Sequence, residues 1–214
     1  MPLDLTTGRV ALVVVDIQAG VTSPRSVLPQ VGAPEAVARA VEVLDAARAA
    51  GLPVIHFKEV HRKEMVDFGR ELDGAEPVHC LETWPDTDYH PDTYPIDGEF
   101  PMQKRRYSCF VGTDLDILLR GLKVDTLVLV GGMTNVCVHY TFADAHQLDY
   151  HAFVVEDAVS GSDWDAHHAA LRAMAYLQRE SRITAAAFVA AARSSDRSGR
   201  HPAGVRGCPG GPGS

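Results

Sequence analysis

The sequence predicts an α/β fold in which buried parallel strands alternate with helices. Two continuous apolar runs, at 10–15 and 127–130, lack the polar alternation of a half-buried strand and indicate strands covered on both faces. A helix is predicted at 34–51, between a starting proline and a terminating glycine, and a strand follows it at 53–57. A strand, a helix and a second strand in this order form a right-handed βαβ unit, which requires a parallel sheet.

Further elements continue the alternation toward the C-terminus. Thr113 is expected to cap a helix whose inner face is made of leucines, and Ser162 and Asp165 to frame the start of another helix. Strands are predicted at 151–157 and 182–184, and an alanine-rich helix follows the second of these.

The segment 59–103 interrupts this rhythm with five prolines, Trp84 and two tyrosines. A long excursion inside a compact domain is usually functional or disordered, and its aromatic content favours an ordered pocket wall. A short strand at 102–107 would place Lys104 and Arg106 on one face. A solvated edge is the alternative role for these charges.

Length and charge limit the classes of function. With 214 residues, of which 46% are hydrophobic, the chain is long enough for one well-packed domain, expected at 1–193, and the Gly/Pro/Ser/Arg-rich segment 194–214 is expected to be a flexible tail. A net charge of −8 and the lack of an extended basic cluster argue against binding to nucleic acid or to an anionic membrane. No apolar run approaches the roughly 20 residues that span a bilayer, and we expect no signal peptide.

Four cysteines occur without C-x-x-C spacing, at positions 80, 109, 137 and 208. This pattern favours a reducing, cytoplasmic location. Cys208 lies in the expected tail and is assigned no role.

Cys137 stands where a buried strand passes into a helix. Gly131 and Gly132 end the apolar run, and Thr134 is expected to cap the helix that follows. Free backbone N–H groups and the helix dipole in a first turn favour a thiolate, the reactive form of cysteine. The alternative is that Cys137 is one more small buried apolar residue.

Asp16 also follows a buried strand, and it is a candidate partner for Cys137. Open parallel sheets bind ligands beyond the carboxyl ends of their strands, where both residues are expected. An acid beside a cysteine can accept the thiol proton, and a lysine can favour the thiolate. A turn or capping role is the alternative for Asp16. A dinucleotide site is not expected, because no G-x-G-x-x-G follows the first strand.

Three motifs occur in order along the chain: Asp16-Ile17-Gln18, then K-x-x-x-S-x-F from Lys104 to Phe110, then G-x-x-T-x-x-C-V from Gly131 to Val138. The sequence Val154-Val155-Glu156-Asp157-Ala158 follows them. With this set the chain resembles the cysteine hydrolases of the isochorismatase-like superfamily, over most of its length. The resemblance implies a three-layer α/β/α domain with a six-stranded parallel sheet of Rossmann-like topology. It also implies a homo-oligomer, a dimer or tetramer.

The same resemblance implies a catalytic triad of Asp16, Lys104 and Cys137. It further implies a non-proline cis peptide at Gly132–Met133, which would aim the Met133 N–H beside that of Cys137 as an oxyanion hole. Thr134 would compete for the Cys137 N–H if it capped the helix.

One branch of the superfamily, the nicotinamidases, binds a metal through an Asp-x-His pair and further histidines. Glu59 and His61 occupy comparable places here, with His79, Cys80 and His90 downstream. These histidines do not align with the pattern, so we predict no metal and no cofactor.

The substrate pocket is predicted to include five residues: His61, Arg62, Trp84, Tyr107 and Asn135.

The predicted function is hydrolysis of a C–N bond in a small amide, ureido or carbamoyl substrate through a thioester. One alternative is isochorismatase-type cleavage of a vinyl ether, although those relatives do not need the cysteine. Another alternative is a catalytically silent binding domain, which the intact triad disfavours.

Overall fold

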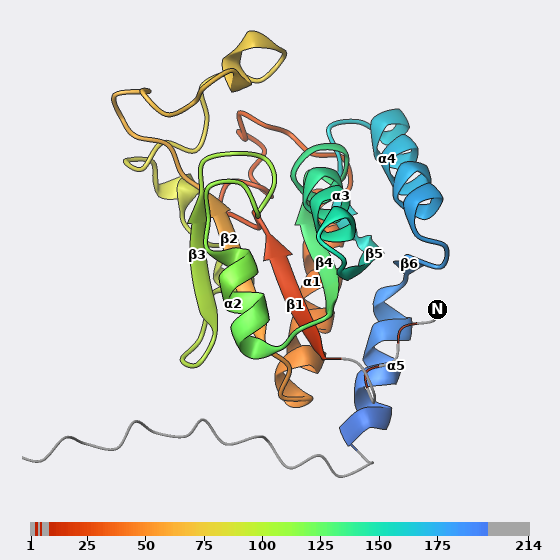
Figure 1. Ribbon diagram of the computed structural model, residues 1–214. Helices are drawn as coiled ribbons and strands as arrows, with labels where there is room; N and C mark the ends of the chain where they lie inside the picture. Colours follow the sequence, from red (N-terminus) through yellow and green to blue (C-terminus); the bar gives the residue numbers. More distant parts are fainter. Residues whose placement is uncertain (1–2, 4, 6–8, 197–214) are drawn as a thin grey trace, which may run out of the picture.

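A parallel sheet lies between two layers of helices (Figure 1). The computed structural model describes residues 3, 5 and 9–196. The main elements are β1 (Val10–Val15), α1 (Ala33–Ala49), β2 (Val54–Glu59), β3 (Phe100–Lys104), α2 (Leu115–Leu122), β4 (Thr126–Gly132), η4 (Thr134–Val138), α3 (His139–Gln147), β5 (His151–Ser160), α4 (Trp164–Leu177), β6 (Arg182–Ile183) and α5 (Ala185–Asp196). The predicted three-layer α/β/α fold is therefore confirmed.

The six strands run parallel in the order β3-β2-β1-β4-β5-β6. From β1 the chain builds outward through β2 and β3, then crosses to β4 and continues through β5 and β6 on the other side. The strand order therefore reverses between β1 and β4, which pair from Val10↔Thr126 to Val15↔Gly131. Their carboxyl ends therefore finish side by side, at the position where open parallel sheets bind ligands.

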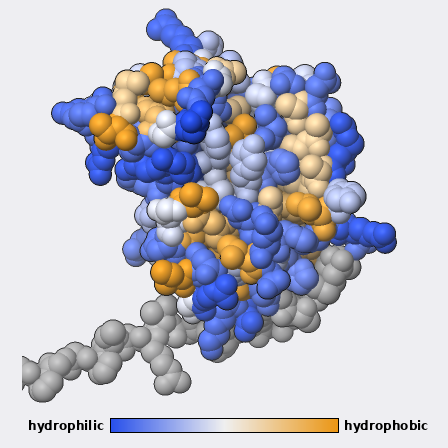
Figure 2. Space-filling model, turned by 45° about the horizontal axis from the view of Figure 1, so that its top comes forward, coloured by the Kyte–Doolittle hydropathy of each residue, from blue (hydrophilic) through white to orange (hydrophobic). Residues whose placement is uncertain are grey.

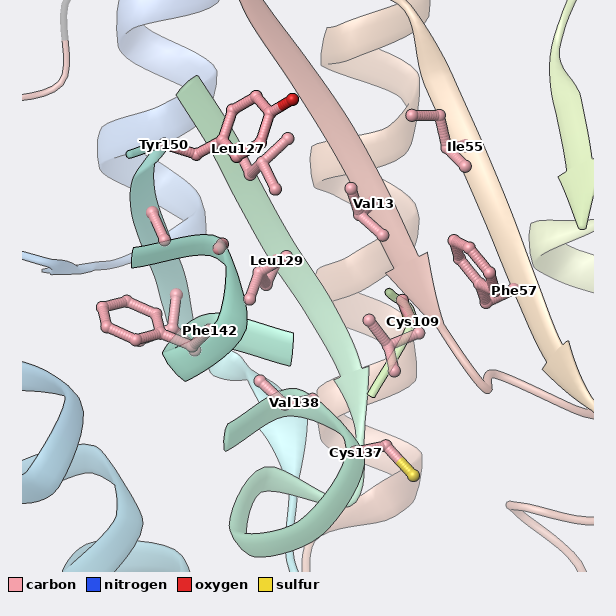
Figure 3. Packing of buried hydrophobic residues seen from close by; sticks show 14 of the residues in the cluster. Val13, Ile55, Phe57, Cys109, Leu127, Leu129, Cys137, Val138, Phe142 and Tyr150 are labelled. Carbon is pink, nitrogen blue, oxygen red and sulfur yellow. The ribbon is translucent and has the colours of Figure 1, made fainter. Parts of the chain in front are cut away.

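The side chains of β1 alternate between two apolar cores, as the period of a strand requires. Val13 belongs to the core on the face covered by α2, α3 and α4, together with Leu119. Phe142 of α3 belongs to the same core (Figure 3). Leu12 packs on the face covered by α1 and α5, with Phe188. Each such buried side chain contributes about 1.5–3 kcal/mol, so both faces fix the position of the strand ends.

The segment between β2 and β3 contains three short 3-10 turns, η1 (Glu71–Asp73), η2 (Pro85–Thr87) and η3 (Pro91–Thr93), and folds over the end of β1. Ala19 N–H donates to the Asp88 carbonyl (2.8 Å), and His90 N–H donates to the Ile17 carbonyl (2.9 Å). The excursion therefore forms an ordered wall beside the strand that leads to Asp16.

The element ends agree with those predicted only in part. Helix α4 begins at Trp164, so the predicted start between Ser162 and Asp165 is confirmed, and Asp163 caps the helix by accepting the Ala166 N–H (2.8 Å). The N-cap position of α2 is Asp114 rather than Thr113, although the Thr113 hydroxyl accepts the Leu115 N–H (3.3 Å).

Two further boundaries differ. Strand β3 ends at Lys104, so Arg106 lies outside it and shares no strand face with Lys104. Helix α5 continues to Asp196, so the first three residues of the segment 194–214 are helical. The rest of that segment, with Cys208, lies outside the described residues. Among the helices of the described part, none is long and apolar enough to span a bilayer.

Candidate active site

The ends of four neighbouring strands bring together four ionisable side chains. Asp16 directly follows β1, Glu59 ends β2 and Lys104 ends β3. Cys137 lies in the single turn of π-helix that follows β4, at the edge of the core cluster (Figure 3). The topology of the sheet, rather than closeness in sequence, therefore assembles this group.

Lys104 is the centre of the group and is 1% exposed. Its Nζ lies 2.8 Å from Asp16 Oδ2 and 2.5 Å from Glu59 Oε2, and it donates to Cys137 Sγ at 3.4 Å. The nearest oxygens of both carboxylates lie within 4.8 Å of the sulfur and of each other. One ammonium thus contacts all three members of the group, and the triad predicted from sequence lies around it together with Glu59.

The two carboxyl groups have different proton affinities although they share one cation. Burial raises the pKa of Asp16 to about 6, against the opposing attraction of Lys104. Glu59 is buried too, but Lys104 and hydrogen bonds from His61 and His79 hold the pKa of its carboxyl well below the usual range. Burial alone would lower the pKa of Lys104, but the negative charges around the ammonium, first that of Asp16, hold this pKa well above its usual value. Asp16 is therefore the group that exchanges a proton near neutral pH, and Glu59 and Lys104 remain charged.

Asp16 is held ready to accept a proton. Its backbone is in the left-handed region (φ 51°), which aspartate tolerates better than most residues. Both carboxylate oxygens are buried, and neither accepts an aligned hydrogen bond within the described structure, although Lys104 Nζ is near. A buried carboxylate with spare acceptor capacity beside a thiol is a suitable general base.

Cys137 is 7% exposed, and its resting form is the thiol rather than the thiolate. Burial raises the pKa of the Cys137 thiol well above its ordinary value, and the attraction of Lys104 offsets only part of this effect. The predicted preference for a thiolate is therefore wrong, because desolvation outweighs the helix terminus. The thiol can donate toward Glu59 Oε2 (3.7 Å), and reaction requires a base to remove its proton.

The turn that carries Cys137 differs from the capped helix predicted. Thr134 does not cap it: the Thr134 hydroxyl lies 2.9 Å from His167 Nδ1, and the N-cap position is Met133. Thr134 therefore does not compete for the Cys137 N–H. The Gly132–Met133 peptide bond is cis. Glycine is required at 131 because a Cβ there (φ 116°) would lie 1.9 Å from the Val15 carbonyl oxygen.

Gln18 fixes the end of β1 relative to the end of β2. Its Nε2 donates to the Glu59 carbonyl (3.0 Å) and the Thr87 carbonyl (2.7 Å), and its Oε1 accepts the Glu59 N–H (3.2 Å). This buried amide joins three chain segments with both of its polar atoms. The glutamine of the Asp16-Ile17-Gln18 motif is therefore a positioning residue for Glu59.

A cavity of about 110 Å³ opens onto Asp16, Glu59 and Cys137. Its size fits a small organic molecule rather than a folded polypeptide. Figure 2, in which the upper end of the molecule in Figure 1 comes forward, shows a mainly hydrophilic surface with separate apolar patches. The other lining residues are Gln18, Gly20, Val21, Arg25, Ser26, Val27, Leu28, Gln30, Glu76, His79, Cys80, Trp84, Asp86, Thr87, Tyr107, Gly132 and Met133.

Two of the five predicted pocket residues, Trp84 and Tyr107, line this cavity, and the prediction is wrong for the other three. His61 is fully buried in a layer behind Glu59. The Arg62 side chain turns outward to Glu82 (2.9 Å). Both polar atoms of the Asn135 side chain bond to Ser162.

Sequence reasoning missed several polar residues of the cavity wall, among them Arg25, Gln30 and Glu76. Gln30 Oε1 accepts from the Ser160 hydroxyl (2.6 Å) and lies against Gly132. No motif marks these loop residues. The sequence marks Glu59 only as a possible metal ligand, and its contact with Lys104 could have been expected because it ends a buried strand next to the one that Asp16 follows.

Behind Glu59 lies a buried group of four possible metal ligands: Glu59, His61, Glu71 and His79. Two imidazoles and two carboxylates suit a divalent transition metal, and neither Glu71 oxygen has a hydrogen-bond partner among the described residues. His90 contacts Thr22 instead (3.2 Å) and lies outside this group. The donor set thus fits a metal, and the expectation that none binds stays a prediction.

Protonation of the two histidines can supply the positive charge that a metal ion would bring to this group. His61 Nε2 lies 3.3 Å from Glu59 Oε1 and 3.2 Å from Glu71 Oε2, and these acidic partners raise the pKa of His61 to about 9, against its burial. His79 Nε2 lies 2.9 Å from Glu59 Oε1, and its pKa is raised as well, again against burial. Both imidazoles are therefore shifted toward the protonated form, whose positive charge offsets that of the two buried carboxylates.

Comparison with known proteins shows the family of this chain. The family model of the isochorismatase domain matches residues 10–188. Ureidoacrylate amidohydrolase RutB of Agrobacterium fabrum is 32% identical, over 73% of this chain and 78% of its own. A cysteine hydrolase from Pseudomonas syringae pv. phaseolicola has a similar structure (TM-score 0.81, 27% identity, 91% of this chain and 96% of that one), as has N-carbamoylsarcosine amidase from Thermoplasma acidophilum (TM-score 0.68, 28% identity, 82% and 95%). The chain therefore belongs to the isochorismatase family of hydrolases.

Proposed function

We propose that this protein hydrolyses a C–N bond of a small amide, ureido or carbamoyl compound, with Cys137 as the nucleophile. The observation that carries the proposal is the contact of one buried ammonium, that of Lys104, with both Asp16 and Cys137. A base and a nucleophile held on one cation beside a cavity suit covalent acyl transfer. Two similar proteins support this bond type, since one is a ureidoacrylate amidohydrolase and the other an N-carbamoylsarcosine amidase.

Acylation begins with proton transfer from the Cys137 thiol to the Asp16 carboxylate. The sulfur then attacks the carbonyl carbon of the substrate, and the electron pair of the C=O bond moves onto the oxygen. Lys104 stays protonated and stabilises the negative sulfur. Positioned proton transfer contributes about 10²–10⁴-fold to such reactions, and it is most effective when the base has a pKa near the working pH.

The backbone N–H groups of Met133 and Cys137 hold the oxyanion of the tetrahedral intermediate in this proposal. Each oxyanion-hole donor is typically worth about 2.7–4 kcal/mol. The intermediate collapses when its C–N bond breaks, and the leaving nitrogen takes the proton from Asp16. A thioester on Cys137 remains.

Deacylation uses one water molecule. Asp16 accepts a proton from the water as the water oxygen attacks the thioester carbonyl. The second tetrahedral intermediate expels the Cys137 sulfur, which recovers the proton from Asp16. The acid is released, and each proton and electron pair is accounted for by these side chains, the substrate and water.

Glu59 has a different role from Asp16 in this scheme, because its low pKa keeps it ionised. Its contact with the Lys104 ammonium (2.5 Å) holds that ammonium beside the base and the nucleophile. A divalent metal bound by Glu59, His61, Glu71 and His79 would supply fixed positive charge or Lewis acidity behind this position. In the steps above, protons move only between Cys137, Asp16, the leaving nitrogen and water.

A substrate screen tests the proposal. Nicotinamide, ureidoacrylate, biuret and N-carbamoyl amino acids are each incubated with the protein, and ammonia release is measured. Release from at least one of them, and its loss after iodoacetamide labels Cys137, is the expected result. Turnover of isochorismate with no ammonia release from any of these amides would contradict the proposal in favour of vinyl-ether cleavage.

A further inference from the structure

The cavity contains one arginine that the proposed chemistry does not use. Arg25 is the only arginine or lysine among the described residues that line the cavity, since Lys104 is buried beneath its floor. Its guanidinium has no ion pair or side-chain hydrogen bond in the described structure. Two other arginines that follow sheet strands are paired: Arg62 with Glu82 (2.9 Å), and Arg105 with Asp67 (3.0 Å).

The acidic groups of the cavity do not satisfy Arg25. Asp16 and Glu59 both contact Lys104. Glu76 is held 3.9 Å from His79, on the wall near Glu59, with its side chain 18% exposed. Asp86 also lines the cavity but forms no ion pair with Arg25. Arg25 therefore lines the cavity as an exposed side chain, and its guanidinium has no anionic partner among the described residues.

The backbone on which Arg25 stands is fixed. Arg25 N–H donates to the Ser23 hydroxyl (3.2 Å), and Ser26 N–H donates to the Ser23 carbonyl (3.0 Å). Gly20 N–H donates to the Asp86 carbonyl (3.1 Å), which joins this segment to the wall of the excursion. The turn therefore presents the guanidinium from an ordered segment, which lowers the entropy lost when it binds a ligand.

We propose that Arg25 binds a carboxylate of the substrate, so that the substrate class is a carbamoyl or ureido acid rather than a neutral amide. This inference rests on the proposed function, because the carbonyl to be attacked must lie at Cys137 while the acid lies at Arg25. A guanidinium matches a carboxylate with two parallel N–H donors, which a neutral amide or alcohol cannot exploit fully. Arg25 is thus a specificity-determining residue at the cavity wall.

Matched pairs of compounds test the inference. Ureidoacetate and 3-ureidopropanoate are compared with (2-hydroxyethyl)urea and (3-hydroxypropyl)urea, which replace the carboxylate by a hydroxyl and add no other hydrolysable group. The measured quantity is the ratio of kcat/KM for acid over alcohol, from ammonia release at pH 7.5. Wild-type protein should prefer the acid, and Arg25→Gln should lower the ratio about 10–100-fold, mainly through KM.

Two further variants separate recognition from general charge effects. Arg25→Lys should retain part of the preference, because it keeps the charge but loses the planar fork. Arg172→Gln, an exposed arginine on α4, removes the same charge away from the cavity and should leave the ratio unchanged. Equal turnover of acid and alcohol by wild-type protein, or an equal loss on both in Arg25→Gln, would overturn the inference.

If wild-type protein hydrolyses none of the four compounds and fails the amide screen as well, the proposed function fails, and binding then decides on Arg25. Calorimetry with the Cys137→Ala protein should detect 3-ureidopropanoate but not (3-hydroxypropyl)urea at equal concentration. The Cys137→Ala/Arg25→Gln protein should lose that difference. Equal binding of the acid by both proteins, or no binding by either, would refute the role of Arg25.

Discussion

Replacing Lys104 by methionine tests whether the ammonium holds the site together. Methionine has a similar length, so the change removes the charge with little loss of volume. It leaves Asp16 and Glu59 buried without the cation that now lies 2.8 Å and 2.5 Å from their oxygens. Both activity and stability should fall. The loss of stability can be given a magnitude from the structure.

The size of this loss follows from burial and distance. At an effective dielectric constant of about 20, unit charges 2.8 Å apart attract each other by about 6 kcal/mol. Desolvation of the lysine offsets part of that attraction, and removal of one partner from a buried ion pair typically costs about 3–5 kcal/mol. We therefore expect the free energy of unfolding of Lys104→Met to be about 3–5 kcal/mol below that of wild type at pH 8.

The deficit should shrink as pH falls. Without Lys104, the folded-state pKa of Asp16, which burial already raises to about 6, rises further, and that of Glu59 rises above its unfolded value of about 4. Proton uptake then favours the folded state at low pH, and this contribution is lost as pH rises through the folded-state values. The loss should therefore be smaller at pH 5 than at pH 8.

Urea unfolding followed by far-ultraviolet circular dichroism measures both quantities. Lys63→Met is the matched control, because the Lys63 side chain is 64% exposed and, among the described residues, its ammonium pairs only with Glu64, a surface contact worth at most about 1 kcal/mol. A loss below about 1 kcal/mol in Lys104→Met, or one that does not depend on pH, would refute the account of the buried charges.

Three other predictions concern the base, the thiol and the assembly. Asp16→Asn should lower kcat by about 10²–10⁴-fold with the fold intact, and kcat/KM of the wild type should rise with pH through about 6 as Asp16 loses its proton; a flat profile from pH 5 to 8 would contradict this. Because burial raises the pKa of Cys137, its alkylation by iodoacetamide should accelerate as pH rises, and mass spectrometry showing fastest labelling below neutral pH would be inconsistent with it. Light scattering should give a dimer or tetramer both for the whole chain and for a chain lacking 197–214, whereas a monomer mass in either case would exclude the proposed homo-oligomer.

The fold could be predicted because its strands are apolar without interruption. The runs at β1 and β4 have no polar face, so only a sheet covered on both sides accommodates them. The residues at their ends, Asp16 and Cys137, follow from the same pattern. The position of β3 in the sheet could not be predicted from the sequence, because a five-residue edge strand with alternating burial has only a weak sequence pattern.

The surroundings of these residues could not be predicted to the same degree. The pKa of Cys137 depends on how deeply the finished fold buries it, and no local motif gives that depth. His61 and Arg62 are adjacent in sequence, yet one is fully buried behind Glu59 and the other turns outward to Glu82. Loop side chains take their direction from tertiary contacts, so neighbours in a loop gave no guide to the cavity.

The central claim is that Cys137 forms the covalent bond to the substrate, and one comparison tests it most directly. Ammonia release from the best substrate of the screen is measured for wild type, Cys137→Ala and Cys109→Ala. Cys109 is the matched control, because it is a buried cysteine of the same core that does not line the cavity. We predict a loss of at least about 10³-fold in kcat for Cys137→Ala and a change of only a few-fold for Cys109→Ala, as for loss of a nucleophile compared with loss of a core thiol. Retention of more than about a tenth of wild-type turnover by a folded Cys137→Ala protein would contradict the claim.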